Sequence, residues 1–333
     1  MSSEDSPAGA GNEPYRAPLT AAHFRPRYWA TWAGVGLMRL LQALPRAVPR
    51  ALAPPLAWLL WRGSAKRRRY ADINLRWCFP EFSDARRAEL LREHYRYAAQ
   101  CLLDYAILWF GSPETHERRI RVVGAEHYRH LQAEGRPAIV LAPHSLALDY
   151  GGLRMSQVCD GVSFVKPMRN PVVEWINHRS RTRYLADMYT REQGLRPAIR
   201  EMRRGRFFYY LPDEDLGAEG AVFAGFFGIP KATLTSLARL ARLTRAEVLP
   251  SFSYYDRERD EYVVKLWPAL AGFPSGDDVA DARAMNAAIE RGVREAPTQY
   301  LWTMRLFRTR PDGGPGPYGP GADTRRPASS HAG

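Results

Sequence analysis

The 333-residue sequence has little of what marks secreted, metal-binding or membrane-spanning proteins. Its three cysteines, Cys78, Cys101 and Cys159, are odd in number and far apart. They predict neither a disulfide framework nor a metal site, and they suit a reducing compartment. No other group of histidines, cysteines and carboxylates has the spacing of a metal site. We therefore expect neither a metal nor another cofactor.

Lysine is also scarce, so arginine carries most of a formal charge of +13. The only lysines are Lys66, Lys166, Lys231 and Lys265. A compositional preference for arginine explains this charge, and so does an anionic partner such as phosphate, acidic lipid or an acidic protein. Aromatic residues are not interleaved with the basic ones as in RNA-binding sheets, and no recognition motif is present. The composition therefore argues against nucleic acid as a partner.

No apolar run is long enough to cross a membrane as a helix. The apolar stretches 28–38 and 51–61 each span about 11 residues, whereas a spanning helix needs roughly 18 to 20. Both stretches contain tryptophan, and the basic run Lys66–Arg69 follows them, which suits the surface of an anionic leaflet. A buried helical hairpin with a solvated basic run is the alternative. We favour membrane attachment.

Composition divides the chain into four regions. Residues 1–22 and 312–333 are polar and rich in glycine and proline, so we expect disordered tails without the pattern of a signal peptide. Residues 23–80 hold the apolar stretches and form the expected membrane-associated helical segment. Residues 81–311 form the main folded domain, which begins with an amphipathic helical segment over 85–110.

Beyond residue 111, apolar strands alternate with helical segments. The predicted strands are 120–123, 138–142, 162–165, 207–211, 246–255 and 262–267. The predicted helices are 125–133, 145–158, 171–184, 197–204, 233–243 and 281–295. This alternation predicts a single α/β domain with a largely parallel sheet flanked by helices. The last two strands are joined by a short polar turn and form a hairpin, so we expect the sheet to be mixed.

One short motif points to chemistry: His144 is followed five residues later by Asp149. It lies between the strand 138–142 and the helix 145–158, at the kind of sheet edge where α/β proteins place their active sites. Five helical residues rotate by about 140°, so the two side chains cannot share one helical face. They can meet if His144 precedes the helix, and a carboxylate on one ring nitrogen leaves the other as a base. A capping histidine and a solvated aspartate would have the same spacing.

Further polar and aromatic segments fall at the loops of this pattern. They are Lys166–Pro171, the arginines Arg179, Arg181 and Arg183, the acidic loop Asp213–Gly217, the aromatic loop 224–233 and the closing stretch 296–302. With His144 and Asp149, they resemble the lipid A biosynthesis (lauroyl/myristoyl) acyltransferases of the lysophospholipid acyltransferase superfamily. The pair matches the His-x4-Asp/Glu motif, and residues 226–233 match the FFG-x-P-x-x-T block. The resemblance extends from about residue 28 to residue 311.

The sequence departs from the usual pattern of this family at several positions. Many members have glutamate in place of Asp149 and arginine in place of Lys166. Many also have Asp-Gln-Asp-Tyr-Gly where this chain has Asp213-Glu-Asp-Leu-Gly217, and histidine where it has Met304. These differences concern details of the substrate more than the chemistry.

The resemblance implies a glycerolipid-acyltransferase-type fold on the cytoplasmic face of a Gram-negative inner membrane. An acyl chain would pass from the acyl carrier protein thioester to a hydroxyl of a lipid A precursor, with His144 as general base oriented by Asp149. No acyl-enzyme nucleophile is implied, and we interpret Ser145 as a helix-start residue. Another glycolipid or a lysophospholipid is the alternative acceptor. A catalytically silent membrane-binding protein with the same fold is the alternative from another class.

The candidate substrate-binding residues are Lys166, Asn170, Arg181, Asp213 and Asp215. Lys166 and Arg181 would meet a phosphate of the precursor or the developing oxyanion. The arginines around Arg181 could equally form a solvated helix end. Asp213 and Asp215 would orient sugar or amide groups, or simply hold the arginines. We interpret the aromatic pair 226–227 as core or as the wall of an acyl channel.

Overall fold

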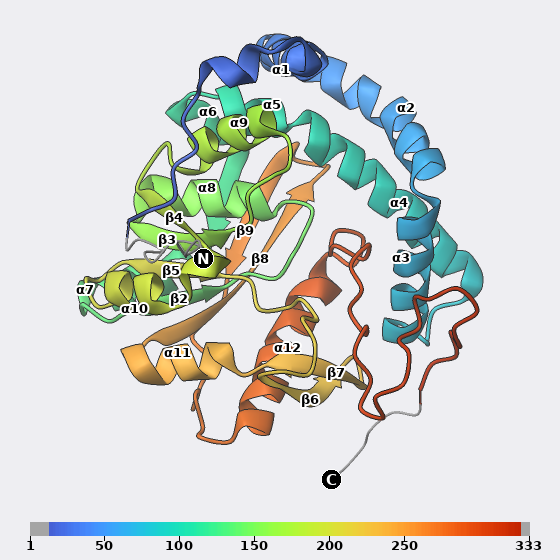
Figure 1. Cartoon of the computed structure of the whole chain (residues 1–333), viewed down its shortest axis with the longest axis vertical. Coiled ribbons are helices and arrows are strands. Elements are labelled where there is room, and N and C mark those ends of the chain that lie inside the picture. Colours follow the sequence, from blue (N-terminus) through green and yellow to red (C-terminus); the bar gives the residue numbers. More distant parts are fainter. Residues whose placement is uncertain (1–12, 328–333) are drawn as a thin grey trace, which may run out of the picture.

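The computed structural model describes residues 13–327, and what was predicted for residues 1–12 and 328–333 lies outside this part of the chain. The main sheet contains β1 (Ile120–Val123), β2 (Ala138–Leu141), β3 (Gly161–Val165), β4 (Ala186–Thr190), β5 (Phe207–Tyr210), β8 (Glu247–Asp256) and β9 (Glu261–Leu266). Their order across the sheet is β1-β9-β8-β2-β5-β3-β4 (Figure 1). Neighbouring strands from β8 to β4 are parallel, β9 is antiparallel to β8, and β1 is parallel to β9. The predicted mixed, largely parallel sheet is confirmed.

Helices flank this sheet and continue into an outer arc. The helices that alternate with strands are α7 (Ala125–Ala133), α8 (Leu148–Val158), α9 (Pro171–Arg181), α10 (Arg196–Met202), α11 (Ser236–Thr244) and α12 (Asp278–Glu295). Before them come α1 (Trp29–Ala43), α2 (Ala47–Gly63), α3 (Ala65–Cys78), α4 (Asp84–Leu103), α5 (Tyr105–Phe110) and α6 (Pro113–Arg119). The 3-10 helices are η1 (Ala21–Phe24), η2 (Pro26–Tyr28) and η3 (Arg191–Gln193). Figure 1 shows α1, α2 and α3, here called the helical arm, as an arc along the top and right of the molecule, with α4 beside α2 and α3.

Every strand and helix predicted beyond residue 111 is present, with ends that shift by a few residues. The predicted hairpin is the antiparallel pair β8–β9. The predicted segment 85–110 is two helices, α4 and α5, which are separated at Asp104. Ser83 caps the first of them by accepting a hydrogen bond from the backbone N–H of Arg86 at 3.2 Å. Capping and periodicity therefore predict where the elements lie, but they do not predict the interruption at Asp104.

The sequence pattern does not reveal three strands. β4 is a partly exposed edge strand in which polar and apolar residues are mixed. β6 (Ala221–Phe226) and β7 (Ile229–Leu234) form a separate antiparallel hairpin beside α12, where a loop was predicted. Phe227 and Gly228 form its turn with φ values of 50° and 72°, the positive angles that tight hairpin turns require. Glycine and proline in this segment therefore shape a hairpin rather than an irregular loop.

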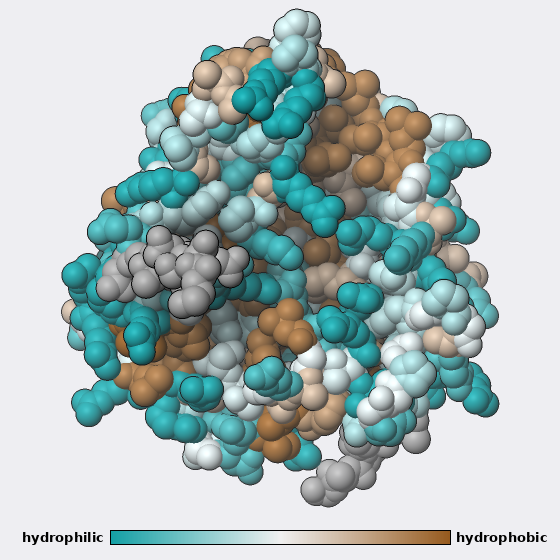
Figure 2. All heavy atoms as spheres, in the orientation of Figure 1, coloured by the Kyte–Doolittle hydropathy of each residue, from teal (hydrophilic) through white to brown (hydrophobic). Residues whose placement is uncertain are grey.

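The helical arm keeps much of its apolar surface exposed. Exposed side chains on α1 and α2 include those of Trp29, Leu37, Leu40, Leu52, Trp58 and Leu59. Figure 2 shows apolar side chains gathered over α2, at the upper right. The alternative of a buried helical hairpin does not account for this exposure. Within residues 13–327, no helix combines the length and apolarity needed to cross a membrane.

Parts of the two predicted tails contact the folded part of the chain. Tyr318 is buried, and the indole of Trp77 donates to the carbonyl of Thr324 at 2.9 Å. Near the other end, the backbone N–H of Tyr15 donates to the carbonyl of Met188 in β4 at 2.7 Å. Residues 13–22 and 312–327 therefore include groups that contact the fold, and the disordered tails stay a prediction. The rest of the two predicted tails, residues 1–12 and 328–333, lies outside the described part of the chain.

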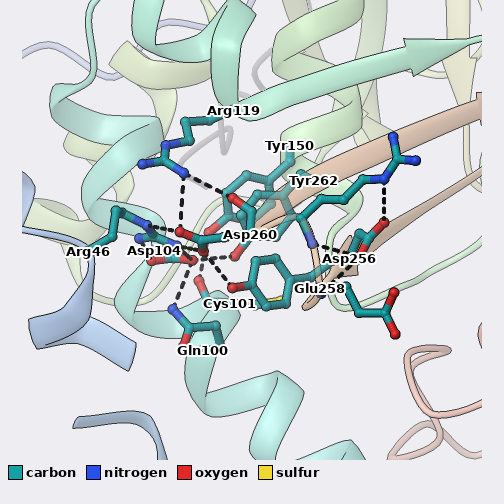
Figure 3. A network of polar contacts seen from close by, with 12 residues as sticks. Arg46, Gln100, Cys101, Asp104, Arg119, Tyr150, Asp256, Glu258, Asp260 and Tyr262 are labelled. Carbon is teal, nitrogen blue, oxygen red and sulfur yellow. Dashed lines mark hydrogen bonds and ion pairs between the residues drawn. The ribbon is translucent and has the colours of Figure 1, made fainter. Parts of the chain in front are cut away.

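Arg46, just before α2, joins the helical arm to the sheet (Figure 3). Its guanidinium donates to Asp104 at 2.9 Å and to Asp260, in the β8–β9 turn, also at 2.9 Å. Asp104 is 1% exposed and accepts further hydrogen bonds from Gln100 and Tyr262. Burial raises the pKa of Asp260, but hydrogen bonds from Arg46 and Tyr255 and the nearby arginine charges outweigh it, so this pKa is lowered. This buried carboxylate lies at the interruption between α4 and α5.

We predict that Arg46→Ala lowers the free energy of unfolding by about 3 to 5 kcal/mol, because it leaves the buried Asp104 charge without its cation. Urea denaturation measures this change. Arg118→Ala, an exposed arginine on α6, is the control and should change stability by less than about 0.5 kcal/mol. Arg46→Ala/Asp104→Asn should recover part of the loss. Equal stability of Arg46→Ala and wild type would contradict this account.

Candidate active site

His144 lies in the loop between β2 and α8, as predicted, and the closing segment of the chain holds this loop. The carbonyl of His144 accepts a hydrogen bond from the backbone N–H of Leu301 at 2.9 Å. The N–H of Leu146 donates to the carbonyl of Gln299 at 2.9 Å. Gln299 is itself fixed, because its side-chain amide makes two 2.8 Å hydrogen bonds to the backbone of Tyr255 in β8. The segment 299–302 therefore works as a clamp on the histidine loop.

The carboxylate that meets the imidazole belongs to Asp213, after β5. Asp213 Oδ1 lies 2.7 Å from His144 Nδ1, and Oδ2 accepts the backbone N–H of His144 at 2.8 Å. The sheet dictates this meeting, since Leu141 of β2 is in register with Tyr210 of β5. His144 and Asp213 each follow these register partners by three residues. Carboxyl ends of neighbouring parallel strands meet at one edge of the sheet, so equal offsets bring the two side chains together.

Three hydrogen-bond donors surround Asp213, which is 1% exposed. Two come from His144, and the third is the hydroxyl of Tyr300, which donates to Oδ2 at 3.0 Å. Burial raises the pKa of Asp213, but the charge and hydrogen bonds of His144 outweigh it and the pKa is lowered. Burial lowers the pKa of His144, but the charge and hydrogen bond of Asp213 and the charge of Glu214 leave it raised. The pair therefore stabilises an imidazolium beside a carboxylate.

The predicted hydrogen bond between Asp149 and His144 is wrong. Asp149 instead accepts hydrogen bonds from Arg181 Nε at 3.0 Å, from Arg181 Nη2 at 3.2 Å and from the hydroxyl of Tyr105 at 2.5 Å. The physical reason is the start of α8 at Leu148 rather than at Ser145. Asp149 then lies in the first helical turn and pairs with α9 and α5, away from the ring nitrogen that Asp213 occupies.

Two other predicted substrate-binding residues have structural partners. Asn170 caps α9 by accepting from the backbone N–H groups of Val172 and Val173, and its amide donates to Thr31 at 2.9 Å. Asp215 accepts hydrogen bonds from the backbone and hydroxyl of Thr309 at 2.7 and 2.6 Å. Both side chains hold the chain in place. The contacts of Asn170 and Asp215 with substrate stay a prediction.

His144 opens onto a cavity of about 440 Å³. Its charged lining comes from His144, Asp149, Lys166, Arg181, Arg191 and Glu214. Most of the remaining wall is apolar, with Phe164 and Val165 of β3 and Met188 of β4 among its side chains. The structure thus brings Lys166, Arg181, Asp149 and His144 together around one cavity. Phe226 and Phe227 are buried in the core and do not line it.

Sequence reasoning missed Glu214, Arg191 and Tyr300. Glu214 lies 4.0 Å from Nε2 of His144 and forms a 2.6 Å ion pair with Arg191 of η3. The sequence could have indicated Glu214, because this residue directly follows Asp213 in the acidic loop. Tyr300 lies in the closing motif, where a buried tyrosine needs a partner for its hydroxyl. Arg191 had no such signal, because its position depends on the unpredicted strand β4.

With Nδ1 held by a buried carboxylate, Nε2 is the ring nitrogen available on the cavity side. Such a histidine can accept a proton from a hydroxyl and release it to a leaving group. Together with a largely apolar cavity, this geometry suits an enzyme that transfers a group to or from a lipid-like substrate. Among the described residues, no group of histidine, cysteine, aspartate and glutamate could hold a metal ion.

Comparison with known proteins places the chain among the acyltransferases. The family model described as bacterial lipid A biosynthesis acyltransferase matches residues 20–309, so the chain belongs to this family. It is 35% identical over 300 residues to a lipid A biosynthesis acyltransferase of Haemophilus influenzae, covering 90% of this chain and 94% of that one. It is 32% identical to the lipid A biosynthesis myristoyltransferase of Escherichia coli (92% and 95% covered). Identity to the lauroyltransferase of that organism is 30% (90% and 98% covered).

We predict that Asp213→Asn lowers the pKa of His144, because burial then acts on the imidazolium without the compensating carboxylate. Titration of histidine ring signals by NMR in labelled protein measures this pKa. Asp149→Asn is the matched control and should move it much less, since Asp149 pairs with Arg181 instead. An equal fall in both variants, or a larger fall in Asp149→Asn, would contradict the assignment of Asp213.

Proposed function

We propose that this enzyme transfers a fatty acyl chain from the thioester of acyl carrier protein to a hydroxyl of a lipid A precursor. The observation that carries the proposal is the His144–Asp213 pair at an apolar cavity. An imidazole with a free Nε2 supplies the base that a hydroxyl nucleophile needs, and an apolar wall suits a hydrocarbon chain. Family membership makes the lipid A class the first choice of acceptor. Another glycolipid or a lysophospholipid is the second candidate.

In this proposal the chemistry needs one base and no covalent enzyme intermediate. Asp213 accepts a hydrogen bond from Nδ1–H, so Nε2 carries the lone pair that removes the proton of the acceptor hydroxyl. The hydroxyl oxygen attacks the thioester carbonyl, and the resulting imidazolium is stabilised by Asp213. The carbon–sulfur bond then breaks, and the imidazolium returns its proton to the leaving thiolate. The raised pKa of His144 helps it to hold the proton between these steps.

Asp149 enters this mechanism as a positioning residue for Arg181. The ion pair at 3.0 Å fixes the guanidinium on the cavity wall, and the Tyr105 hydroxyl fixes the carboxylate from its other side. Asp149 raises the pKa of Arg181 by its charge, so the guanidinium remains a permanent cation. In this position Arg181, with Lys166 on the same cavity, can meet a phosphate of the precursor or the developing oxyanion. Removal of Asp149 would release Arg181 rather than misorient His144.

We also propose that the helical arm attaches the enzyme to the cytoplasmic face of the inner membrane. The side chains of Trp58 and Leu59 are each 57% exposed near the end of α2, and Leu37 and Leu40 on α1 are similarly exposed. Contiguous apolar surface of this kind marks an interaction site. Tryptophan with neighbouring arginine suits the membrane interface. A lipid substrate would then reach the cavity from the surface in which it resides.

We predict that His144→Ala lowers acyl transfer by about 10²- to 10⁴-fold without loss of the fold, because it removes the general base. The assay is transfer from an acyl carrier protein thioester to a lipid A precursor, with circular dichroism as the folding check. His130→Ala removes an exposed histidine whose side chain is 70% accessible, and this control should keep wild-type activity. Wild-type turnover by His144→Ala would overturn the mechanism.

We predict that Trp58→Ser/Leu59→Ser weakens binding to neutral phosphatidylcholine vesicles by at least about tenfold, since burial of each large apolar side chain contributes about 1.5 to 3 kcal/mol. Co-sedimentation with vesicles measures the binding. Val158→Ser/Leu243→Ser replaces comparably exposed apolar residues outside the arm and should leave binding intact. Equal binding by both double variants would rule out α2 as an anchor.

A further inference from the structure

A second cavity lies outside the site that contains His144. It has a volume of about 650 Å³ and lies between the start of α3 and the C-terminal segment 305–320. Its lining residues are all different from those of the His144 cavity. Figure 1 shows the C-terminal segment, in red, beside α3. The cavity therefore joins two parts of the chain that are separated by more than 200 residues in sequence.

Only positive charge lines this second cavity. Lys66 and Arg69 come from α3, Arg305 and Arg308 come from the C-terminal segment, and no carboxylate side chain is part of the lining. Within residues 13–327, none of these four cations forms an ion pair with a carboxylate, whereas Arg206 elsewhere pairs with three. Four unpaired cations around one hollow repel one another. Their arrangement creates a strongly attractive site for an anion.

Buried hydrogen bonds hold the two walls of this cavity together. Asn74, on the buried face of α3, is 0% exposed. Its amide nitrogen donates to the carbonyls of Trp302 and Met304 at 2.7 and 2.8 Å. Its carbonyl oxygen accepts the hydroxyl of Tyr318 at 2.5 Å. One side chain thus fixes the C-terminal segment before Arg305 and again after Arg308.

One of the two cations on the α3 wall is fixed as well. Arg69 donates to the carbonyl of Gly319 at 2.8 Å, so its guanidinium stays at the boundary between the two walls. Guanidinium groups bind phosphate with two parallel hydrogen bonds. A phosphate between the walls can therefore meet charge from both sides, which a basic run on a single helix cannot provide.

The position of the cavity points to a lipid as the source of the phosphate. Lys66 lies one turn beyond the end of α2, where Trp58 and Leu59 are exposed. Tyr70 and Pro315 add nonionic wall beside the cations. An amphiphile can place its phosphate between the walls and its chains against the apolar end of α2. We propose that this cavity binds the phosphate of an anionic lipid headgroup, an inference that rests on the proposed membrane attachment.

The test measures binding of dihexanoyl phosphatidic acid below its micelle concentration to the full-length protein by isothermal titration calorimetry. A monomeric probe has no surface potential, so general attraction between the basic arm and an anionic leaflet does not contribute. We expect Arg305→Gln/Arg308→Gln and Lys66→Gln/Arg69→Gln each to weaken binding by at least about tenfold, since each removes two charged partners of the phosphate. The four side chains are exposed at the cavity, and thermal melts check that the variants fold.

Arg62→Gln/Arg67→Gln is the matched control. It removes the same charge from neighbouring exposed positions that do not line the cavity, and its affinity for the probe should stay within about twofold of wild type. Equal losses in the control and in the two wall variants would overturn the proposal, because diffuse charge would then explain binding. Inorganic phosphate that binds as tightly as the lipid would overturn the lipid assignment.

Two further measurements separate this inference from the proposed function. His144→Ala should bind the probe like wild type, so a failure of the transfer assay alone counts against the proposed chemistry and not against this site. Acyl carrier protein is the competing anionic partner. If Arg305→Gln/Arg308→Gln weakens binding of that protein while affinity for the lipid probe is unchanged, the cavity is a protein-docking surface and the lipid proposal is wrong.

Discussion

The buried carboxylate of Asp213 is the group on which the arrangement of the site depends. A charge removed from water destabilises a fold unless donors surround it, and here the donors come from distant parts of the chain. His144 follows β2, Asp213 follows β5, and Tyr300 belongs to the closing segment. The same carboxylate therefore orders three segments and sets the protonation of the imidazole. Asp213 therefore has both a structural role and a chemical role in the site.

The sequence located most of the sheet and the histidine, but it did not identify the partner of that histidine. Alternating periodicity placed the strands, and the strand-to-helix junction placed His144. Asp149 looked like the partner because it is close in sequence, whereas the actual pairing follows from the order of strands and from the register of Leu141 with Tyr210. That register is a long-range property which no local pattern contains. The same reason explains why Arg191 was not predicted as a site residue. Its position depends on the edge strand β4, which the sequence pattern does not reveal.

A second group of ion-paired charges connects the helical arm to the sheet. Arg46 precedes α2, Asp104 ends α4, and Asp260 lies in the β8–β9 turn. Arg46 therefore links the start of α2 both to the end of α4 and to the β8–β9 turn. Their shared ion pairs give the helical arm a fixed orientation relative to the sheet edge. The exposed apolar surface of the arm and the sheet that carries the His144 cavity then keep fixed positions relative to each other.

The clamp formed by residues 299–302 has a consequence for the order in which the enzyme is made. The exposed apolar stretches before residue 62 leave the ribosome first, and domains fold progressively as the chain is synthesised. His144, by contrast, gains its backbone clamp and the Tyr300 hydroxyl on Asp213 only after residue 302 has emerged. A nascent chain therefore carries its exposed apolar surface long before its histidine loop is complete. If the helical arm attaches the enzyme to a membrane as proposed, a chain that terminates before residue 299 would carry this surface without an assembled base.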